Sequence, residues 1–203
     1  MNDIADPDSL RAHMGAISPM AERKVLPRLD AHSRRFIELS PLLVLASSDA
    51  KGNVDASPRG DPPGFVRIVD DRTLLIPDRP GNNRVDTFAN ILNAPGVGLI
   101  FFVPGIDETL RVNGTARLLT QADALAASEI AGKTPRIGLL VQVAEVFFHC
   151  GKALKRARAW DPAARIERNT FPSLGRIIAE QVGGFTAEQA DARIETAYRD
   201  RLY

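Results

Sequence analysis

Short apolar segments separated by turn residues constrain the fold of this chain more than any other feature of its sequence. Seven segments are expected to be strands: 42–49, 54–60, 64–70, 73–77, 97–103, 109–120 and 136–150. The first two flank the turn Ala50-Lys51-Gly52-Asn53, in which glycine supplies a positive φ. Strands this short, at hairpin spacing, favour an antiparallel barrel over a parallel sheet. The sequence therefore predicts a mainly β fold with helices, built on six to seven antiparallel strands.

Two of these strands carry additional signals. The segment 97–103 (VGLIFFV) is apolar throughout and shows no alternation, which predicts that both of its faces are covered. The segment 109–120 is long and contains Gly114, a candidate β-bulge.

Helices are expected on both sides of the barrel. Residues 1–40 are predicted to be a helical segment that packs on the barrel, with Asp30 as a helix cap. Residues 41–150 form the barrel itself. Residues 151–203 are predicted to be a C-terminal helical extension, whose last helix opens with a capping box at Thr186 and Gln189. Shorter helices are expected after residue 84, with Val85, Phe88 and Ile91 or Leu92 on one face, and over 121–131.

Composition excludes several classes of function. The 203 residues include 26 Lys and Arg against 25 Asp and Glu, so a net charge of +1 provides no general attraction to nucleic acid or membranes. The single cysteine, Cys150, cannot form an intrachain disulfide and favours a reducing compartment. The first residues lack the basic start and apolar run of a signal peptide. We expect a cytoplasmic protein with neither a nucleic-acid nor a membrane partner.

The segment 78–84 (DRPGNNR) has the chemistry of a phosphate-binding loop. Gly81 allows close approach of the backbone to a ligand, and the helix expected after the loop directs free N–H groups toward an anion. Asn82 and Asn83 add amide donors, and Arg84 adds a guanidinium. An ordinary turn followed by a solvated arginine explains the same residues equally well. The loop lacks the Gly-Lys-Ser/Thr of a P-loop and the G-x-G-x-x-G of a dinucleotide site.

Three motifs, SPRGD (57–61), PGNNR (80–84) and LRVNG (110–114), together resemble those of the pyridoxamine-5′-phosphate-oxidase-like FMN-binding proteins. The similarity extends over roughly 30–162 and is greatest to the branch of predicted flavin-nucleotide-binding proteins. The resemblance implies an FMN-binding split β-barrel of Greek-key type. It also implies a homodimer that holds the flavin at the subunit interface.

The same resemblance implies roles for individual residues. Ser57 and Arg59 would lie along the flavin, and the asparagines and arginine of the loop would hold its phosphate. Thr109 and Arg111 would contact the flavin from the partner subunit. The predicted cofactor-binding residues are Ser57, Arg59, Asp78, Gly81, Asn82, Asn83, Arg84, Thr109 and Arg111.

A basic segment follows the last predicted strand and ends at Trp160. Lys152, Arg156 and Trp160 are interpreted as a lid over the flavin or an anionic substrate, although a solvated helical face is the alternative. No histidine or cysteine spacing indicates a metal site. No catalytic side chain is predicted, because the flavin carries the redox chemistry.

The function predicted from the sequence is an FMN-dependent oxidoreductase that passes a hydride through flavin N5 to or from a small molecule that the sequence does not identify. A lysine and an arginine–histidine pair of the oxidase have no counterpart here, and Gly60-Asp61-Pro62-Pro63 follows Arg59 instead. The alternatives are a protein that stores or senses flavin without turnover, and a barrel that has lost its flavin.

Overall fold

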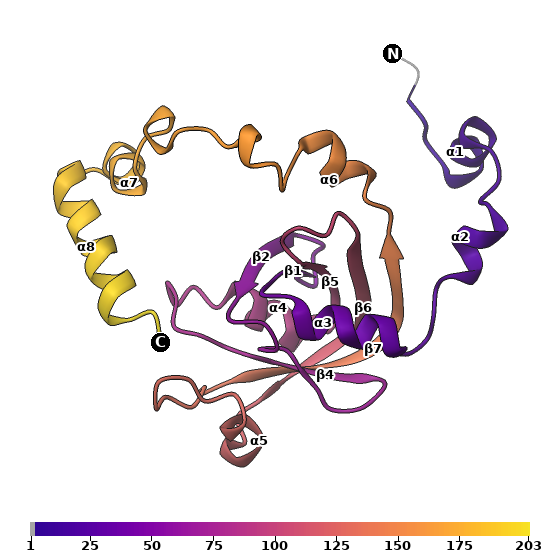
Figure 1. Cartoon of the computed structure of the whole chain (residues 1–203), viewed down its shortest axis with the longest axis horizontal. Helices are drawn as coiled ribbons and strands as arrows, with labels where there is room; N and C mark the ends of the chain where they lie inside the picture. The colour runs from indigo at the N-terminus through magenta and orange to yellow at the C-terminus, as the bar shows by residue number, and fades with distance from the viewer. Residues whose placement is uncertain (1–2) are drawn as a thin grey trace.

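The computed structural model describes residues 3–203, which form a seven-stranded antiparallel sheet curled into a split β-barrel with helices around it (Figure 1). The strand order is β2-β1-β5-β6-β7-β4-β3. The strands are β1 (Leu42–Ser48), β2 (Val54–Gly60), β3 (Arg67–Ile68), β4 (Thr73–Pro77), β5 (Gly96–Phe102), β6 (Thr109–Leu119) and β7 (Gly138–His149). The predicted mainly β fold, with its antiparallel core, is confirmed.

The helices precede, interrupt and follow the sheet. The α-helices are α1 (Pro7–Met14), α2 (Pro19–Arg23), α3 (Ala31–Leu39), α4 (Asp86–Asn93), α5 (Ala122–Ala126), α6 (Lys152–Ala157), α7 (Leu174–Val182) and α8 (Ala187–Asp200). Two 3₁₀ turns, Pro162–Ala164 and Arg168–Thr170, lie between α6 and α7. Within residues 3–203, no helix has both the length and the apolar character needed to span a membrane.

Local chemistry fixes the register of the first hairpin. Asp49 accepts hydrogen bonds from the main-chain N–H of Lys51 and Asn53, at 2.8 and 2.9 Å. Gly52 has a φ of 85°, a conformation that costs glycine little. The turn therefore places Ser48 opposite Val54. This register sets the position of β2, the strand that lines the candidate site, along β1.

The expected bulge in the sixth strand is confirmed. The β6–β7 register shifts between Asn113 and Gly114. A Cβ atom at Gly114 would lie 1.9 Å from the main-chain oxygen of Gln142, so only glycine fits this crossing. The bulge bends the long β6–β7 ribbon, as bulges in barrels commonly do.

The core lies inside the curled sheet, where the alternate side chains of each strand meet. Its largest fully buried side chains are Phe101, Ile37, Leu43, Leu45, Leu74, Ile76, Leu99, Leu110, Leu125 and Leu139. Helix α3 covers one opening: Asp30 caps it, as predicted, and Phe36 packs edge-to-face on Phe148 at 5.4 Å. Burial of these apolar side chains is the main stabilisation of the fold.

The prediction that both faces of 97–103 are covered is wrong for the chain by itself. Val97, Leu99 and Phe101 are buried, but Ile100 on the opposite face is 37% exposed. The strand therefore alternates in burial although both of its faces are apolar. The continuous apolar pattern of this segment therefore does not distinguish a strand covered on both faces from one with an exposed apolar face.

Several predicted boundaries are also corrected. Of 64–70, only Arg67–Ile68 pairs as a strand, and of 121–131 only Ala122–Ala126 is α-helical. Val85 precedes α4 and is exposed, so the inner face of that helix is formed by Thr87, Phe88 and Ile91.

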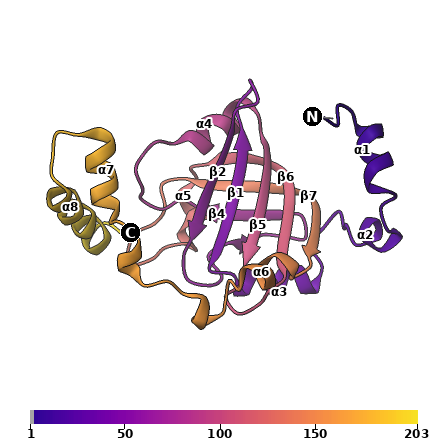
Figure 2. The same cartoon turned by 90° about the horizontal axis from the view of Figure 1, so that it is seen from above.

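The terminal regions differ in how they meet the barrel. Helices α1 and α2 bury none of their residues within the described chain and extend away from the barrel, whereas α3 packs against it. Figure 2 shows α7 and α8 side by side, next to the barrel rather than over the sheet. Asp191 of α8 caps α7 by accepting from the Gly175 N–H at 2.9 Å and from Ser173 Oγ at 2.6 Å. The predicted capping box at Thr186 is present.

Candidate functional site

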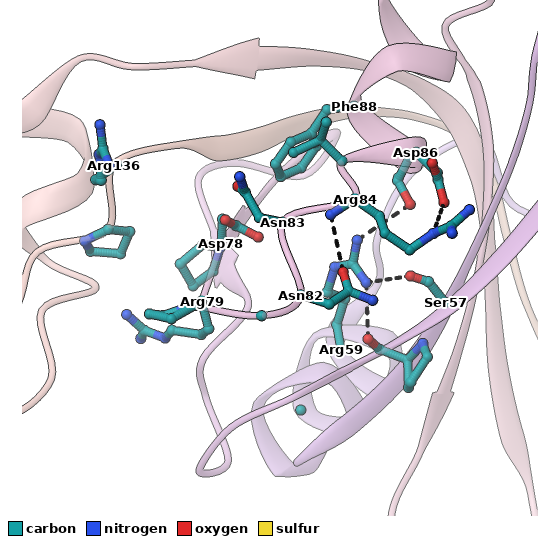
Figure 3. A pocket seen from close by; sticks show the side chains of 18 of the residues that line it. Ser57, Arg59, Asp78, Arg79, Asn82, Asn83, Arg84, Asp86, Phe88 and Arg136 are labelled. Carbon is teal, nitrogen blue, oxygen red and sulfur yellow. Dashed lines mark hydrogen bonds and ion pairs between the residues drawn. The ribbon is translucent and has the colours of Figure 1, made fainter. Parts of the chain in front are cut away.

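A cavity of about 1040 Å³ opens between β2, the loop 78–85, the first turn of α4 and the segment 133–136 (Figure 3). Its lining includes most of the predicted cofactor-binding residues: Ser57, Arg59, Asp78, Gly81, Asn82, Asn83 and Arg84. These residues come from two parts of the chain that are not adjacent in the sheet, β2 and the connection after β4. The volume is at the upper end of small-molecule sites.

The strand β2 contributes its half-buried face to this cavity. Asp55, Ser57 and Arg59 alternate along the strand and share that face. Arg59 donates to Ser57 Oγ at 2.5 Å and to Thr87 Oγ1 at 3.3 Å, and Thr87 donates to Asp55 at 2.6 Å. Among residues 3–203, Arg59 forms no ion pair within 4 Å. Its charge is therefore held in place by hydroxyl groups and left available for an anion.

The loop 78–85 ends in two residues with left-handed backbone. Asn83 has a φ of 59° and Val85 a φ of 56°. The conformation is uncommon for any residue except glycine and is a true outlier for a β-branched side chain. Gly81, which the sequence analysis selected as the flexible point, lacks a positive φ, and a Cβ there would meet nothing within 4 Å in the described chain. The loop is bent at Asn83 and Val85, while Gly81 leaves open space beside the backbone.

Helix α4 begins at Asp86 immediately after this bend. Its cap position is Val85, and no side chain in the described residues caps its first N–H groups. Uncapped N–H groups and the positive end of the helix dipole favour an anion. The helix expected after the loop 78–84 is therefore present, and it starts two residues after Arg84.

Arg84 lies at the edge of the cavity with 72% of its side chain exposed. Its Nε donates to Asp86 at 2.7 Å, and its main-chain N–H donates to Asn82 Oδ1 at 3.1 Å. The hydrogen bond that Arg84 donates to the Asp86 carboxylate raises the pKa of Arg84 above its ordinary value. An anion at this edge would therefore meet a guanidinium that already has an acidic neighbour.

Asp78 begins the loop, and burial raises its pKa above the ordinary range. The nearby guanidinium groups of Arg59 and Arg79 oppose that shift without cancelling it. Its main-chain N–H donates to the Ile137 oxygen at 2.9 Å, which ties the loop to the start of β7. Asp78 therefore places a carboxylate between two positive groups at the base of the cavity.

Arg79 serves the scaffold of the site. Its Nε lies 2.6 Å from the buried Asp61 carboxylate, and its Nη2 donates to the Ser128 oxygen at 2.9 Å. The ring of Tyr203 lies beside its guanidinium, 5.7 Å from ring centroid to Cζ. These contacts occupy the guanidinium and join the end of β2 to the start of the loop.

The remaining predicted site residues do not line this cavity. Thr109 is opposite His149 in the β6–β7 ladder, and Arg111 lies over the Phe147 ring at 5.5 Å. Trp160 donates its indole N–H to the Ile106 oxygen at 2.9 Å, beside the β5–β6 connection. Lys152 and Arg156 lie on α6 and are exposed. Within one chain, the predicted lid and the predicted strand contact are thus separate from the phosphate-binding loop.

Other cavity residues were not selected by the sequence analysis. They include Asp55, Phe65, Thr87, Phe88, Lys133, Arg136 and Tyr203. Asp55 and Thr87 flank selected residues and could have been found from strand alternation and the first helical turn. Nothing in the local sequence marks Lys133, Arg136 or Tyr203, which reach the cavity from distant segments. Among the described residues, no group of three or more His, Cys, Asp or Glu side chains could hold a metal ion.

The fold is a split β-barrel whose cavity brings together the uncapped start of α4 and Arg59, which forms no ion pair within 4 Å in the described chain. The family described as pyridoxamine 5′-phosphate oxidase matches residues 29–150, which is more than half of the chain. The chain belongs to the pyridoxamine 5′-phosphate oxidase family. No curated protein matches the chain.

Several solved structures are similar in fold. HupZ from Group A Streptococcus is 20% identical, with a TM-score of 0.48 over 59% of this chain and 93% of that one. An FMN-binding protein from Syntrophomonas wolfei is 13% identical, with a TM-score of 0.43 over 58% and 88% of the two chains. A protein of the pyridoxinephosphate oxidase family from Clostridium acetobutylicum is 14% identical, with a TM-score of 0.41 over 58% and 85%.

Proposed function

We propose that this chain binds FMN in the cavity between β2 and the loop 78–85 and works as a flavin-dependent oxidoreductase. The observation that supports this most directly is the combination of Arg59, which forms no ion pair within 4 Å in the described chain, with the uncapped start of α4. Both features require an anion to satisfy them, and they line the same cavity. Membership of the pyridoxamine 5′-phosphate oxidase family supports a flavin as the carrier of that anion.

The donor set of the cavity fits FMN. The first turn of α4, Asn82, Asn83 and Arg84 would hold the phosphate, and Ser57 and Arg59 would lie along the rest of the cofactor. The volume of about 1040 Å³ accommodates a drug-sized molecule with space left over. When bound, the flavin supplies hydride transfer through its N5 atom. The protein's part is to bind and orient, and Arg59 would stabilise negative charge on the reduced ring.

We further propose a homodimer with the flavin at the interface. The predicted contacts Thr109, Arg111 and Trp160 are separate from the cavity in one chain, so a single flavin would reach them if a second chain contributed them. The outward apolar face of β5, with Ile100 partly exposed, is a surface that a partner could cover. Cys150 is an exposed free thiol, which supports a reducing compartment such as the cytoplasm.

One purification tests the cofactor. We expect the protein to be yellow, with a flavin absorbance spectrum, and the released ligand to have the mass of FMN. A deazaflavin would have a different mass, and a colourless protein that takes up no FMN on titration would contradict the proposal.

Turnover separates an oxidoreductase from a flavin store or sensor. Anaerobic addition of NADH or NADPH to the loaded protein should bleach the flavin absorbance if either is the electron donor. A panel of reducible small molecules added to chemically reduced protein should then restore it. Loaded protein that exchanges electrons with none of these would favour storage or sensing.

A further inference from the structure

Tyr203 follows α8 in the chain and lines the cavity. Its hydroxyl donates to Asp61 Oδ1 at 2.9 Å, and Lys133 Nζ donates to its main-chain oxygen at 2.5 Å. Its ring lies beside the Arg79 guanidinium and lines the cavity. Asp61 is almost fully buried, so the phenol is attached to a fixed point of the barrel.

The two helices that precede Tyr203, α7 and α8, pack closely against each other as a helical hairpin. Asp191 of α8 caps α7, and the main chain of Gly175 passes so close to it that a Cβ there would lie 2.3 Å from Asp191 Oδ1. Figures 1 and 2 agree that the two helices lie beside the barrel, with the chain returning to it after α8. Tyr203 is therefore a point at which the hairpin meets the candidate site.

We propose that Tyr203 is a ligand-binding residue that forms an aromatic wall of the flavin cavity and is positioned by Asp61. This inference rests on the proposed function. Tyr203 stands with Arg79 at the beginning of the loop 78–85, while Arg84 and the uncapped turn of α4 stand at its end. A phosphate at the end of the loop leaves the uncharged part of the ligand for the Tyr203 side. A phenol ring suits that part because aromatic faces pack on planar rings and on carbon chains.

The arrangement around the phenol also explains why it points into the site. Asp61 accepts from both Arg79 and Tyr203, so its two oxygens hold the loop and the phenol together. The hydrogen bond to Asp61 also raises the pKa of Tyr203 and keeps the phenol in its donating form. A ligand that contacts the ring would therefore contact a side chain held by the same carboxylate that holds Arg79.

The opposite role for Tyr203 is a plug that occupies the cavity until a ligand displaces it. The two roles predict opposite effects of removing the ring. A wall residue contributes to affinity, so its loss weakens binding. A plug competes with the ligand, so its loss strengthens binding.

The experiment titrates apo protein with FMN and with riboflavin, following flavin fluorescence. We expect Tyr203→Ala to weaken both ligands by roughly threefold to tenfold, the range of one aromatic contact. Tyr203→Phe, which keeps the ring and loses the bond to Asp61, should lose less. Tyr198→Ala is the control, because Tyr198 is 63% exposed on α8, the helix that precedes Tyr203, and does not line the cavity. Unchanged or tighter binding in Tyr203→Ala would overturn the inference.

A second readout does not depend on flavin. Hydrogen exchange of the apo protein should be faster over 187–200 in Tyr203→Ala than in wild type, because the hairpin loses its attachment to Asp61. Unchanged exchange would also overturn the positioning by Asp61. A wild type that binds no flavin would contradict the proposed function, whereas flavin binding that ignores Tyr203 would contradict this inference alone.

Discussion

The carboxylate of Asp61 and the guanidinium of Arg79 lie 2.6 Å apart, with 1% and 17% of their side chains exposed. The pair connects the residue after β2 to the second residue of the loop that bends around the cavity. Two charges removed from water in this way are stable only while both are present. The pair therefore holds the end of β2 and the start of the loop 78–85 together at the candidate site.

The first prediction is that Arg79→Ala destabilises the fold. Leaving Asp61 buried without its partner should lower the free energy of unfolding by about 3–5 kcal/mol. Urea unfolding followed by circular dichroism measures this. Arg176→Ala removes an ion pair with Glu180 on the exposed surface and should lower the free energy of unfolding far less. Equal losses in the two variants would show that burial of the Asp61 pair is unimportant.

The second prediction concerns the bulge in β6. Gly114→Ala should lower the free energy of unfolding by about 1–3 kcal/mol, because the added methyl group collides with the main-chain oxygen of Gln142 and forces the strands apart. Gly96→Ala at the start of β5 is the control, since its Cβ would meet nothing within 4 Å in the described chain. The same thermal or urea measurement should show the control close to wild type.

Features set by neighbouring residues could be predicted from the sequence. The turn at Gly52, the cap at Asp30 and the capping box at Thr186 all depend on contacts a few residues away. The same holds for the loop 78–84, where glycine, amides and arginine occur together. These parts of the fold and of the site are encoded locally. The bulge is indicated by Gly114 itself, although the contact that requires glycine there is with Gln142 on β7.

Features set by distant residues could not be predicted. Arg79 precedes the glycine turn, and by sequence alone it looks less important than Arg84. Its partner Asp61 is 18 positions away, and Tyr203 approaches the same carboxylate from 142 positions away. The apolar pattern of β5 likewise does not say whether its outer face is covered by the same chain. Only the tertiary arrangement places Arg79 in the scaffold and Tyr203 in the cavity.

The third prediction follows from His149. Burial, together with the positive charges of Lys24 and Arg111, lowers the pKa of this histidine below its ordinary value. A lowered pKa means that the folded state resists protonation, so stability is present above the unfolded value near 6.5 and is lost as pH falls through the folded pKa. His149→Asn should therefore flatten the decline of the unfolding free energy below pH 6.5. Urea titrations between pH 8 and pH 5 measure it.

The control for this pH effect is His13→Asn on α1, a helix that buries none of its residues in the described chain. Its pH profile should follow that of wild type. If His149→Asn and wild type lose stability in parallel as pH falls, another group is responsible for the acid sensitivity.

The fourth prediction tests the proposed dimer. Ile100→Glu places a charge in the middle of the outward face of β5 and should convert a dimer to a monomer at micromolar concentration. Sedimentation velocity gives the mass, and flavin affinity should fall in parallel if the partner contributes contacts. Val69→Glu is the control, because Val69 is exposed beyond β3 at the edge of the sheet. A wild type that is monomeric with flavin bound would contradict the proposal.

The last prediction is that Arg84 distinguishes FMN from riboflavin. Arg84 stands beside the uncapped start of α4, where a phosphate would meet N–H groups and a guanidinium together. A charge-assisted hydrogen bond is stronger than a neutral one, but the exposure of Arg84 and its bond to Asp86 reduce what the phosphate contact contributes. Arg84→Ala should therefore weaken FMN binding by roughly tenfold and leave riboflavin, which has no phosphate, almost unchanged.

Two further variants complete this test by fluorescence titration of apo protein. Asp86→Asn removes the carboxylate that competes for Arg84, so it should tighten FMN and not riboflavin. Arg35→Ala removes an exposed arginine that pairs with Glu38 on α3, away from the cavity, and should change neither affinity. Equal losses for FMN and riboflavin in Arg84→Ala would indicate general damage to the loop. No loss for either ligand would show that Arg84 is not the phosphate ligand.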